Sequence, residues 1–322
     1  MKRNERIAFW IFKPEQISMT TAISKSPRVS IGLAVYNGER FLSKTIDSLL
    51  TQTFTEFEII ICDNCSKDGT EQICRSYAAS DSRIQYHRNS TNIGAPRNFN
   101  LVTTLSRGEY FKWSGADDLC APAMIERCVE ILDHRSDVVL CYPKTRLIDE
   151  NDVPAQDYED RLDLQLAAPN WRLACLLWNI RMCNAVFGLI RSSALKRTHL
   201  FGTYSNSDIV FLAELALHGP FVELPETLFF RRSFELSAIK YRSPYERMVM
   251  FEPNGVGELA FPNWRLFLGF LSAIHRAPVG WIESLRCYAR MHIWLRRWRA
   301  GLSEDLVVAL RYLMRSRFHF RA

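Results

Sequence analysis

Apolar, often β-branched runs alternate along the chain with segments in which apolar positions recur every three or four residues. The runs predict buried strands, and they occupy residues 28–36, 57–63, 83–88, 109–113 and 137–142. The segments between them predict helices at residues 42–50, 68–79, 98–106 and 125–132; the first and last have an apolar stripe, and the second opens with a capping pattern of Asp68 and Glu71. Strand and helix therefore alternate regularly up to residue 142.

This alternation is typical of a doubly wound α/β fold, a mixed but mostly parallel sheet with helices on both faces. In such sheets, ligands bind beyond the carboxyl ends of the strands. Polar residues follow three of the predicted strands, namely Tyr36 and Asn37, then Asp63, then Asp117 and Asp118. We expect these side chains to line one shared crevice.

Asp117 and Asp118 are adjacent like charges that repel each other. The chain has no GxGxxG motif after the first strand and no GxxxxGK[ST] loop, so a bound diphosphate needs another source of positive charge. A divalent cation held by the two carboxylates would supply that charge. The alternative is that the pair caps the helix after Pro122 and that Asp63 belongs to an ordinary turn.

Composition limits the class of protein. The 322 residues are 48% hydrophobic, which suits one large domain or a domain with an appendage. No apolar run reaches about 18 residues, and the apolar stretch at residues 7–12 is too short for a secretory signal. The nine cysteines are scattered, which fits buried, reduced thiols. We expect a cytoplasmic protein with a loosely ordered leader over residues 1–27.

The basic character belongs to the C-terminal end. Residues 261–322 hold eleven arginines, no lysine and three acidic residues, a net charge of +8 against +6 for the whole chain. Apolar positions there step by three or four residues between Trp281 and Trp298, with arginines interleaved. Residues 241–322 are therefore predicted to form a linker and a basic amphipathic tail. The tail either lies on an anionic membrane or packs on the main domain, and no motif for reading nucleic acid accompanies it.

Four segments occur in a characteristic order: VSIGLAVYNGERFLSKTIDSLLTQTFTEFEIIICDNCSKDGT, NIGAPRNFN, GEYFKWSGADD and NSDIVFLAELALHG. Together they resemble family 2 glycosyltransferases of the GT-A fold over residues 28–235. The resemblance implies a domain, which we place at residues 28–240, that binds a nucleotide-diphosphate sugar with Mg²⁺ or Mn²⁺. It also implies transfer of the sugar to an acceptor with inversion at the anomeric carbon.

The resemblance also implies roles for individual positions. Asp63 would bond the base edge, while Tyr36 and Asn37 would lie against the base or ribose. Arg97 would help to hold the nucleotide. Asp117 would approach the ribose or the metal, and Asp118 would bind the metal. Asp208 would be the catalytic base, although an aspartate in a first helical turn often only stabilises the helix dipole.

Two positions depart from the family pattern, and one further cation is a candidate. Gly115 stands where many members have the first aspartate of DxDD, and Ala34 replaces a common proline. The metal site would then depend on the two remaining aspartates. Arg231 and Arg232 follow an apolar strand end, and we choose Arg232 as the candidate that reaches a phosphate.

The expected function is a metal-dependent, inverting transfer of sugar to a glycan or lipid-linked acceptor in cell-surface polysaccharide synthesis. The donor would be a UDP- or dTDP-sugar, and the enzyme would work at the inner face of the membrane. Two alternatives remain: a sugar-1-phosphate nucleotidyltransferase and a catalytically inactive sugar-binding scaffold module. The sequence does not indicate the sugar.

Overall fold

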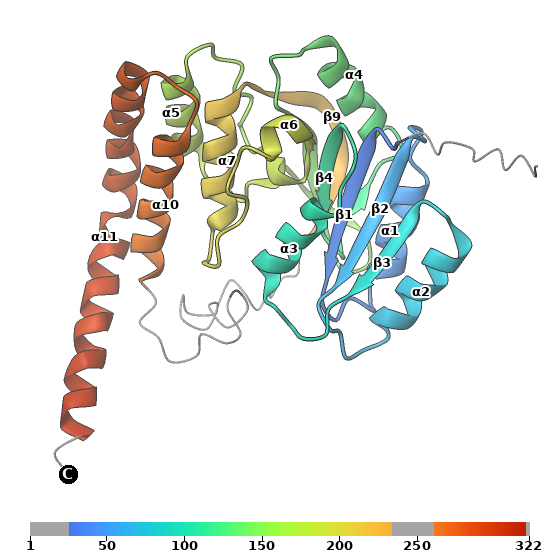
Figure 1. The fold of residues 1–322 in the computed structure, drawn as a ribbon, viewed down its shortest axis with the longest axis horizontal. Helices are drawn as coiled ribbons and strands as arrows, with labels where there is room; N and C mark the ends of the chain where they lie inside the picture. Colours follow the sequence, from blue (N-terminus) through green and yellow to red (C-terminus); the bar gives the residue numbers. More distant parts are fainter. Residues whose placement is uncertain (1–25, 234–250, 252–260, 320–322) are drawn as a thin grey trace, which may run out of the picture.

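The structure is a computed structural model that describes residues 26–233, 251 and 261–319 (Figure 1). Its strands are β1 (Val29–Val35), β2 (Phe57–Asp63), β3 (Ile84–Arg88), β4 (Tyr110–Ser114), β5 (Leu119–Cys120), β6 (Leu140–Ile148), β7 (Pro154–Tyr158), β8 (Leu189–Arg191) and β9 (Phe221–Arg232). Its α-helices are α1 (Leu42–Leu50), α2 (Thr70–Ser80), α3 (Ala95–Thr104), α4 (Met124–His134), α5 (Pro169–Asn179), α6 (Ser192–Leu195), α7 (Ser207–His218), α10 (Pro262–Arg276) and α11 (Trp281–His319). One 3₁₀ turn, η1 (Asn184–Phe187), precedes β8.

The strands form one mixed sheet in the order β3-β2-β1-β4-β8-β6-β9-β5, with β7 paired to β6. Strands β3, β2, β1 and β4 are mutually parallel, and β6 is parallel to β9. Strand β8 joins these two parallel groups through antiparallel pairs with β4 and β6. The predicted doubly wound, mostly parallel sheet is therefore confirmed.

The sheet is covered on both faces because successive residues of a strand point to opposite sides. In β2, Ile59 and Ile61 join the hydrophobic core beneath α1, α2 and α4. Ile60 and Cys62 join the core on the other face, which also contains buried residues of α5, α7, α10 and α11. All seven residues of β1 and of β2 are buried, as their continuous apolar sequences predict.

The main departures from the predicted elements lie after residue 137. The strand predicted at 137–142 is longer and runs from Leu140 to Ile148. Strands β5, β7 and β8 have no counterpart among the predicted elements, and of β9 only the end before Arg231 was predicted. Strands β5, β7 and β8 each pair antiparallel with their neighbours, and β9 brings its carboxyl end beside β6 and β5.

The C-terminal helices pack on the main sheet domain. Helix α10 lies against α7, and α11 lies against α5 and α10 (Figure 1). Glu214 of α7, only 1% exposed, accepts hydrogen bonds from Arg276 of α10 at 2.9 and 3.1 Å. Glu214 is therefore not the surface charge that a helix position suggests. The predicted boundary at residue 240, the linker and the leader fall almost entirely outside the described residues.

Within the described part of the chain, no helix is both long and apolar enough to cross a membrane. All nine cysteines are free thiols, and seven of them are buried, as expected from their apolar surroundings.

Candidate active site

The loops that follow β1 and β2 are bonded to each other. Asn37, with φ of 51°, donates its backbone N–H to Ser66 Oγ at 2.9 Å. Its side-chain Oδ1 accepts the backbone N–H of Lys67 at 2.9 Å. The neighbouring Tyr36 ring is 46% exposed. The paired loops therefore present an aromatic surface at the carboxyl edge of the sheet, where the sequence placed a base or ribose.

Asp63 is held by contacts within the protein. Its side chain is fully buried, with Oδ1 accepting Ser66 N–H at 2.8 Å and Oδ2 accepting the Tyr86 hydroxyl at 2.8 Å. Arg88 adds an ion pair at 3.4 Å. These contacts fix the loop after β2 against β3, and the predicted bond from Asp63 to a base edge stays a prediction.

The two adjacent aspartates converge on Gly115. A Cβ atom at position 115 would lie 2.7 Å from Asp118 Oδ2 and 3.2 Å from Asp117 Oδ1, so both oxygens occupy the space that a side chain would fill. Burial and the neighbouring Asp117 charge raise the pKa of Asp118 to about 7, and burial raises the pKa of Asp117. The glycine that departs from the DxDD pattern is what makes room for this arrangement.

A divalent cation fits these two carboxylates. Asp118 is buried and Asp117 is partly buried, so two like charges facing one space are destabilised, and a cation between them would relieve both the repulsion and the desolvation. Among the described residues, no group of three or more His, Cys, Asp or Glu side chains gathers as a metal site. Mg²⁺ in proteins is commonly held by one or two carboxylates, with phosphate oxygens and water completing the shell. The donor set suits that arrangement.

Arg232 is placed differently from its prediction. Its side chain is fully buried and bonds Asp117 O at 2.9 Å, Asp149 O at 2.7 Å and Asp152 Oδ1 at 2.6 Å. Its backbone N–H donates to Asp118 Oδ1 at 3.0 Å. With its guanidinium committed to protein oxygens, Arg232 does not reach a phosphate. It instead joins the end of β9 to the aspartate pair.

Arg231, the neighbouring cation, acts electrostatically on the carboxyls of the candidate site. Its side chain is partly exposed and donates to Asn184 Oδ1 and, at 3.2 Å, to Met182 O. Its positive charge lowers the pKa values of four nearby carboxyls, although burial keeps each of them above its ordinary value; these belong to Asp117, Asp118, Asp160 and Asp208. One guanidinium therefore has the metal pair and the predicted base within its electrostatic reach. Because the two arginines are adjacent, sequence spacing could not show which of Arg231 and Arg232 faces the candidate site.

Asp208 lies in the first turn of α7, after Asn206 in the left-handed region at φ of 64°. Burial raises the pKa of its carboxyl above the ordinary value of 3.8, while the backbone N–H of Ile209 and the Arg231 charge oppose that shift. A carboxylate with a raised pKa is a better proton acceptor than a solvated one. The geometry is compatible with the predicted base.

Asp160 was not predicted and belongs to the same surroundings. It is 4% exposed, and its Oδ2 accepts Ala185 N–H at 2.6 Å, while its Oδ1 is buried without a hydrogen bond. Burial raises the pKa of Asp160 to about 6. Asn184, the residue before Ala185, accepts a hydrogen bond from Arg231. By bonding Ala185, Asp160 therefore fixes the turn that positions the Arg231 guanidinium. Nothing in its local sequence indicates this, since it lies 25 residues from its partner.

Arg97 lies in the first turn of α3, exposed, and donates weakly to Ile93 O at 3.5 Å. The next residue, Asn98, donates to Cys62 O at 2.7 Å and so fixes this turn to the end of β2. The predicted contact of Arg97 with a nucleotide stays a prediction, and its position beside the β2 end is compatible with it.

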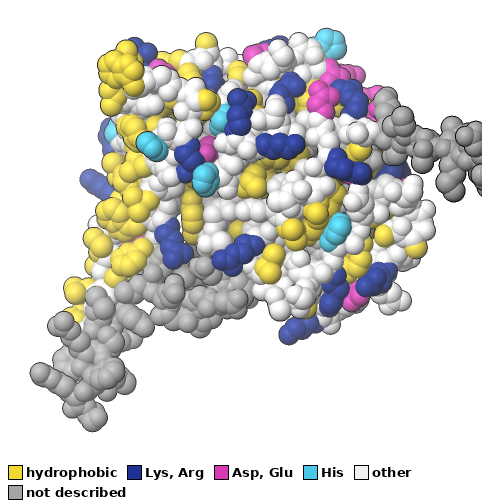
Figure 2. Space-filling model, viewed as in Figure 1, with side chains coloured by type: hydrophobic (Ala, Val, Ile, Leu, Met, Phe, Trp, Pro, Cys, Tyr) yellow, Lys and Arg dark blue, Asp and Glu magenta, His cyan; other side chains and the backbone are white. Residues whose placement is uncertain are grey.

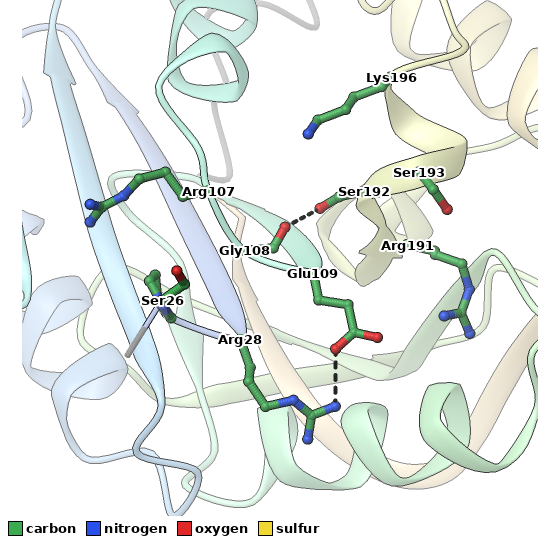
Figure 3. A pocket seen from close by; sticks show the side chains of 10 residues that line it. Ser26, Arg28, Arg107, Gly108, Glu109, Arg191, Ser192, Ser193 and Lys196 are labelled. Carbon is green, nitrogen blue, oxygen red and sulfur yellow. Dashed lines mark hydrogen bonds and ion pairs between the residues drawn. The ribbon is translucent and has the colours of Figure 1, made fainter. Parts of the chain in front are cut away.

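A cavity of about 660 Å³ lies at the opposite, amino edge of the sheet (Figure 3). Two of its four cations are paired with carboxylates: Arg28 bonds Asp133 at 2.6 Å and Glu109 at 3.3 Å, and Arg107 bonds Glu58 at 2.6 Å, while Arg191 donates to backbone carbonyls and Lys196 is exposed. Figure 3 shows Arg28 and Glu109 pointing towards each other across the cavity. The carboxyl edge, with its uncompensated carboxylates, is therefore the better candidate for chemistry.

A mostly parallel sheet with paired aspartates at its carboxyl edge defines the GT-A class of fold. Two solved structures are similar to this one: TarS 1–349 of S. aureus in complex with UDP, and the mannosyltransferase PcManGT of Pyrobaculum calidifontis in complex with GDP-Man and Mn²⁺. The first has a TM-score of 0.62 at 17% identity, over 84% of this chain and 72% of that chain. The second has a TM-score of 0.50 at 15% identity, over 90% of this chain and 88% of that chain. At these identities, the likeness concerns the fold.

Sequence relatives specify the family. The family model described as glycosyl transferase family 2 matches residues 30–198. EpsE of Bacillus subtilis (strain 168) is 36% identical over 115 residues, which is 35% of this chain and 41% of that protein. Chondroitin synthase of Escherichia coli is 30% identical over 147 residues, which is 45% of this chain and 21% of that protein. The matches thus span less than half of these relatives. This chain belongs to glycosyl transferase family 2, as its motifs indicated.

Proposed function

We propose that this protein transfers a sugar from a UDP- or dTDP-type nucleotide sugar to a glycan or lipid-linked acceptor, with inversion. The observation that carries the proposal is that Asp117, Asp118 and Asp208 all lie within the electrostatic reach of Arg231. An inverting transfer needs a site that stabilises the leaving diphosphate and a separate base. Residues 28–240 would form this catalytic unit, with residues 241–322 appended.

The nucleotide would lie at the loops after β1 and β2. Tyr36 offers an exposed ring for the base, and Asn37 holds the two loops together. Arg97, at the start of α3, would add a positive charge beside the ribose and phosphates. The structural relatives bound to UDP and to GDP-Man support a nucleotide in this class of fold.

Asp117 and Asp118 would hold Mg²⁺ or Mn²⁺. When bound there, the cation would supply Lewis-acid stabilisation of the negative charge that develops on the departing diphosphate. Arg231 would add a fixed positive charge on the same side, held in place by Asn184. Arg232 would keep the aspartate pair against β9 through its bond to Asp118.

Asp208 would act on the acceptor. Its carboxylate accepts the proton of the acceptor hydroxyl while that oxygen forms a bond to the anomeric carbon. The bond from that carbon to the phosphate oxygen breaks, and its electron pair leaves with the nucleoside diphosphate. One displacement on the face opposite the leaving group gives inversion, so no covalent intermediate is needed.

The acceptor would be a growing cell-surface polysaccharide or its lipid-linked precursor, with the enzyme working from the cytoplasm at the inner face of the membrane. The similarity to chondroitin synthase, by its name a maker of polysaccharide, supports this substrate class.

The test is to incubate the full chain with Mn²⁺ and a panel of UDP-, dTDP- and GDP-sugars and to measure released nucleoside diphosphate. Release with at least one donor is expected. Release of pyrophosphate from a nucleoside triphosphate and a sugar phosphate would instead indicate a nucleotidyltransferase. Binding of donor with no release, with or without added glycan acceptors, would indicate an inactive sugar-binding module.

Matched variants sharpen this test. Asp117→Asn should abolish release, because it removes one of two carboxylates from the metal site. Asp137→Asn, which changes an exposed aspartate paired to Arg135 at 2.9 Å away from the site, should release diphosphate like the wild type. Equal activity of the two variants would overturn the site assignment.

A further inference from the structure

Helix α11 has one face buried and one face unpartnered. Its buried side chains include Cys287, Met291 and Trp294, which join the core over α5 and α10. Of the fifteen exposed large hydrophobic side chains in the described residues, eight belong to this one helix. They are Trp281, Ile282, Leu285, Leu295, Leu306, Val307, Leu310 and Met314. At about 100° per residue, all eight fall within an arc of about 140°. We call this arc the outer face of α11.

The apolar surface continues beyond α11. On α5, Trp178 is 73% exposed and Trp171 is half exposed, and on α10 Leu268 is exposed. Both tryptophans border α11, since Arg297 donates to Trp178 O at 3.2 Å and Arg290 lies 3.8 Å above the Trp171 ring. Figure 2 shows hydrophobic side chains gathered along this edge of the molecule, over α10 and α11. Contiguous exposed apolar surface of this kind marks an interaction site.

The outer face is also strongly basic. Its middle, between Leu285 and Leu306, carries Arg296 and Arg299, and further exposed arginines lie at its margins, at positions 286, 297 and 311. Glu304 is the one exposed acidic residue among the described side chains of α11. Arginines alternating with tryptophan and leucine on one helix face are the composition of helices that lie in the headgroup region of a bilayer.

We infer that the outer face of α11 docks on an anionic lipid bilayer, with its arginines at the lipid phosphates and its tryptophan and leucine side chains at the acyl boundary. Charge decides between a bilayer and a second copy of this chain. Two copies meeting through this face would bring the exposed arginines of each against those of the other. Of these arginines, Arg286 already pairs with Glu283, and Glu304 is the one exposed acidic residue among the described side chains of the helix. An anionic surface attracts the same arginines, by roughly a factor of five in affinity for each.

The position of α11 relates this surface to the chemistry. The C-terminal half of the helix extends on the side of the molecule where β1, β2 and β4 end (Figure 1). A bilayer along α11 would therefore reach the same end of the molecule as the candidate active site, to which a lipid-linked acceptor must come. This inference rests on the proposed function only for the acceptor, since the outer face itself contains no catalytic group.

Vesicle co-sedimentation of the full chain tests the inference. Wild type should bind vesicles of phosphatidylcholine mixed with phosphatidylglycerol, and bind vesicles of phosphatidylcholine alone at least about tenfold more weakly. The double variant Arg296→Glu/Arg299→Glu should lose about tenfold or more in affinity for the anionic vesicles, and Leu306→Glu/Leu310→Glu should lose a similar amount.

Two exposed positions elsewhere provide controls. Val153→Glu adds a charge at an exposed apolar residue between β6 and β7, and Lys196→Glu reverses an exposed charge at the amino edge of the sheet. Both should bind anionic vesicles like the wild type. Circular dichroism should show that all variants are folded, and diphosphate release with donor alone should be unchanged in all of them.

Three results would overturn the inference: no binding of wild type to anionic vesicles at low salt, equal binding by α11 variants and controls, or a dimer in solution that the α11 substitutions dissolve. The last would assign the face to a second copy of the chain. Because donor turnover is measured separately, failure of membrane binding with intact diphosphate release leaves the proposed function standing. The reverse result would contradict the proposed function alone.

Discussion

Asp160 should make the stability of this protein depend on pH in a measurable way. Burial raises the pKa of its carboxyl from 3.8 to about 6, so the folded protein binds a proton there more tightly than the unfolded chain. Its contribution to the free energy of unfolding is therefore greatest at acid pH and declines as the pH rises through about 6. A difference of about two pKa units corresponds to about 3 kcal/mol.

The substitution Asp160→Asn removes this titration while leaving an oxygen to accept the Ala185 N–H. The difference in unfolding free energy between the variant and wild type should shift by about 3 kcal/mol in favour of the variant between acid and neutral pH. Urea denaturation of both proteins without ligand, over a series of pH values, measures that difference. Other groups that titrate in both proteins cancel.

Asp157→Asn is the matched control, three residues earlier. Asp157 is an exposed carboxylate whose pKa is lowered by its hydrogen bond to Arg146, so its difference curve should be small and of opposite sign. A flat curve for Asp160→Asn, or one indistinguishable from that of Asp157→Asn, would refute the argument that burial raises the pKa of Asp160.

Three further outcomes follow from the packing and the site. Arg276→Met should lower the free energy of unfolding, measured by urea denaturation, by about 3–5 kcal/mol, because it leaves the Glu214 carboxylate buried without its ion-pair partner. The double variant Arg276→Met/Glu214→Gln should be destabilised less, because it no longer buries that charge. Gly115→Ala should weaken Mn²⁺-dependent donor binding about tenfold or more in calorimetry, because its Cβ would meet Asp118 at 2.7 Å. Asp208→Asn should lower kcat by about 10²–10⁴ with donor affinity unchanged, and wild-type kcat should fall on acidification at a pH above 3.8. Unchanged stability of Arg276→Met, unchanged donor affinity of Gly115→Ala or unchanged kcat of Asp208→Asn would contradict the corresponding prediction.

The parallel part of the sheet was predictable because its strands carry their signal locally. β1 and β2 are continuous apolar runs buried on both faces, and each is followed by a helix with one apolar stripe. Strands β5 and β9 were not predictable in the same way. β5 has two residues, and β9 mixes buried and exposed positions through a proline and two irregular registers against β6. Such strands are defined by their neighbours, not by their own sequence.

The same distinction applies to the site. Position after a strand end was enough to place Asp117 and Asp118 at the carboxyl edge of the sheet, because that edge of a parallel sheet gathers such residues. Position did not predict that Arg232 is buried, because the partners that enclose its side chain lie about 80 and 115 residues away in the sequence. Asp63, similarly, ends a strand as expected but is sealed by Tyr86 from the next strand. Local residue spacing does not show whether a segment distant in the sequence buries a charged side chain.

Calorimetric titration with UDP tests most directly whether a cation at the paired aspartates holds the diphosphate. The account predicts that wild type binds UDP about tenfold or more tightly with Mn²⁺ than with chelator, and that Asp118→Asn binds it equally weakly under both conditions. Equal affinity of wild type with and without Mn²⁺, or Mn²⁺-dependent binding that survives in Asp118→Asn, would contradict it.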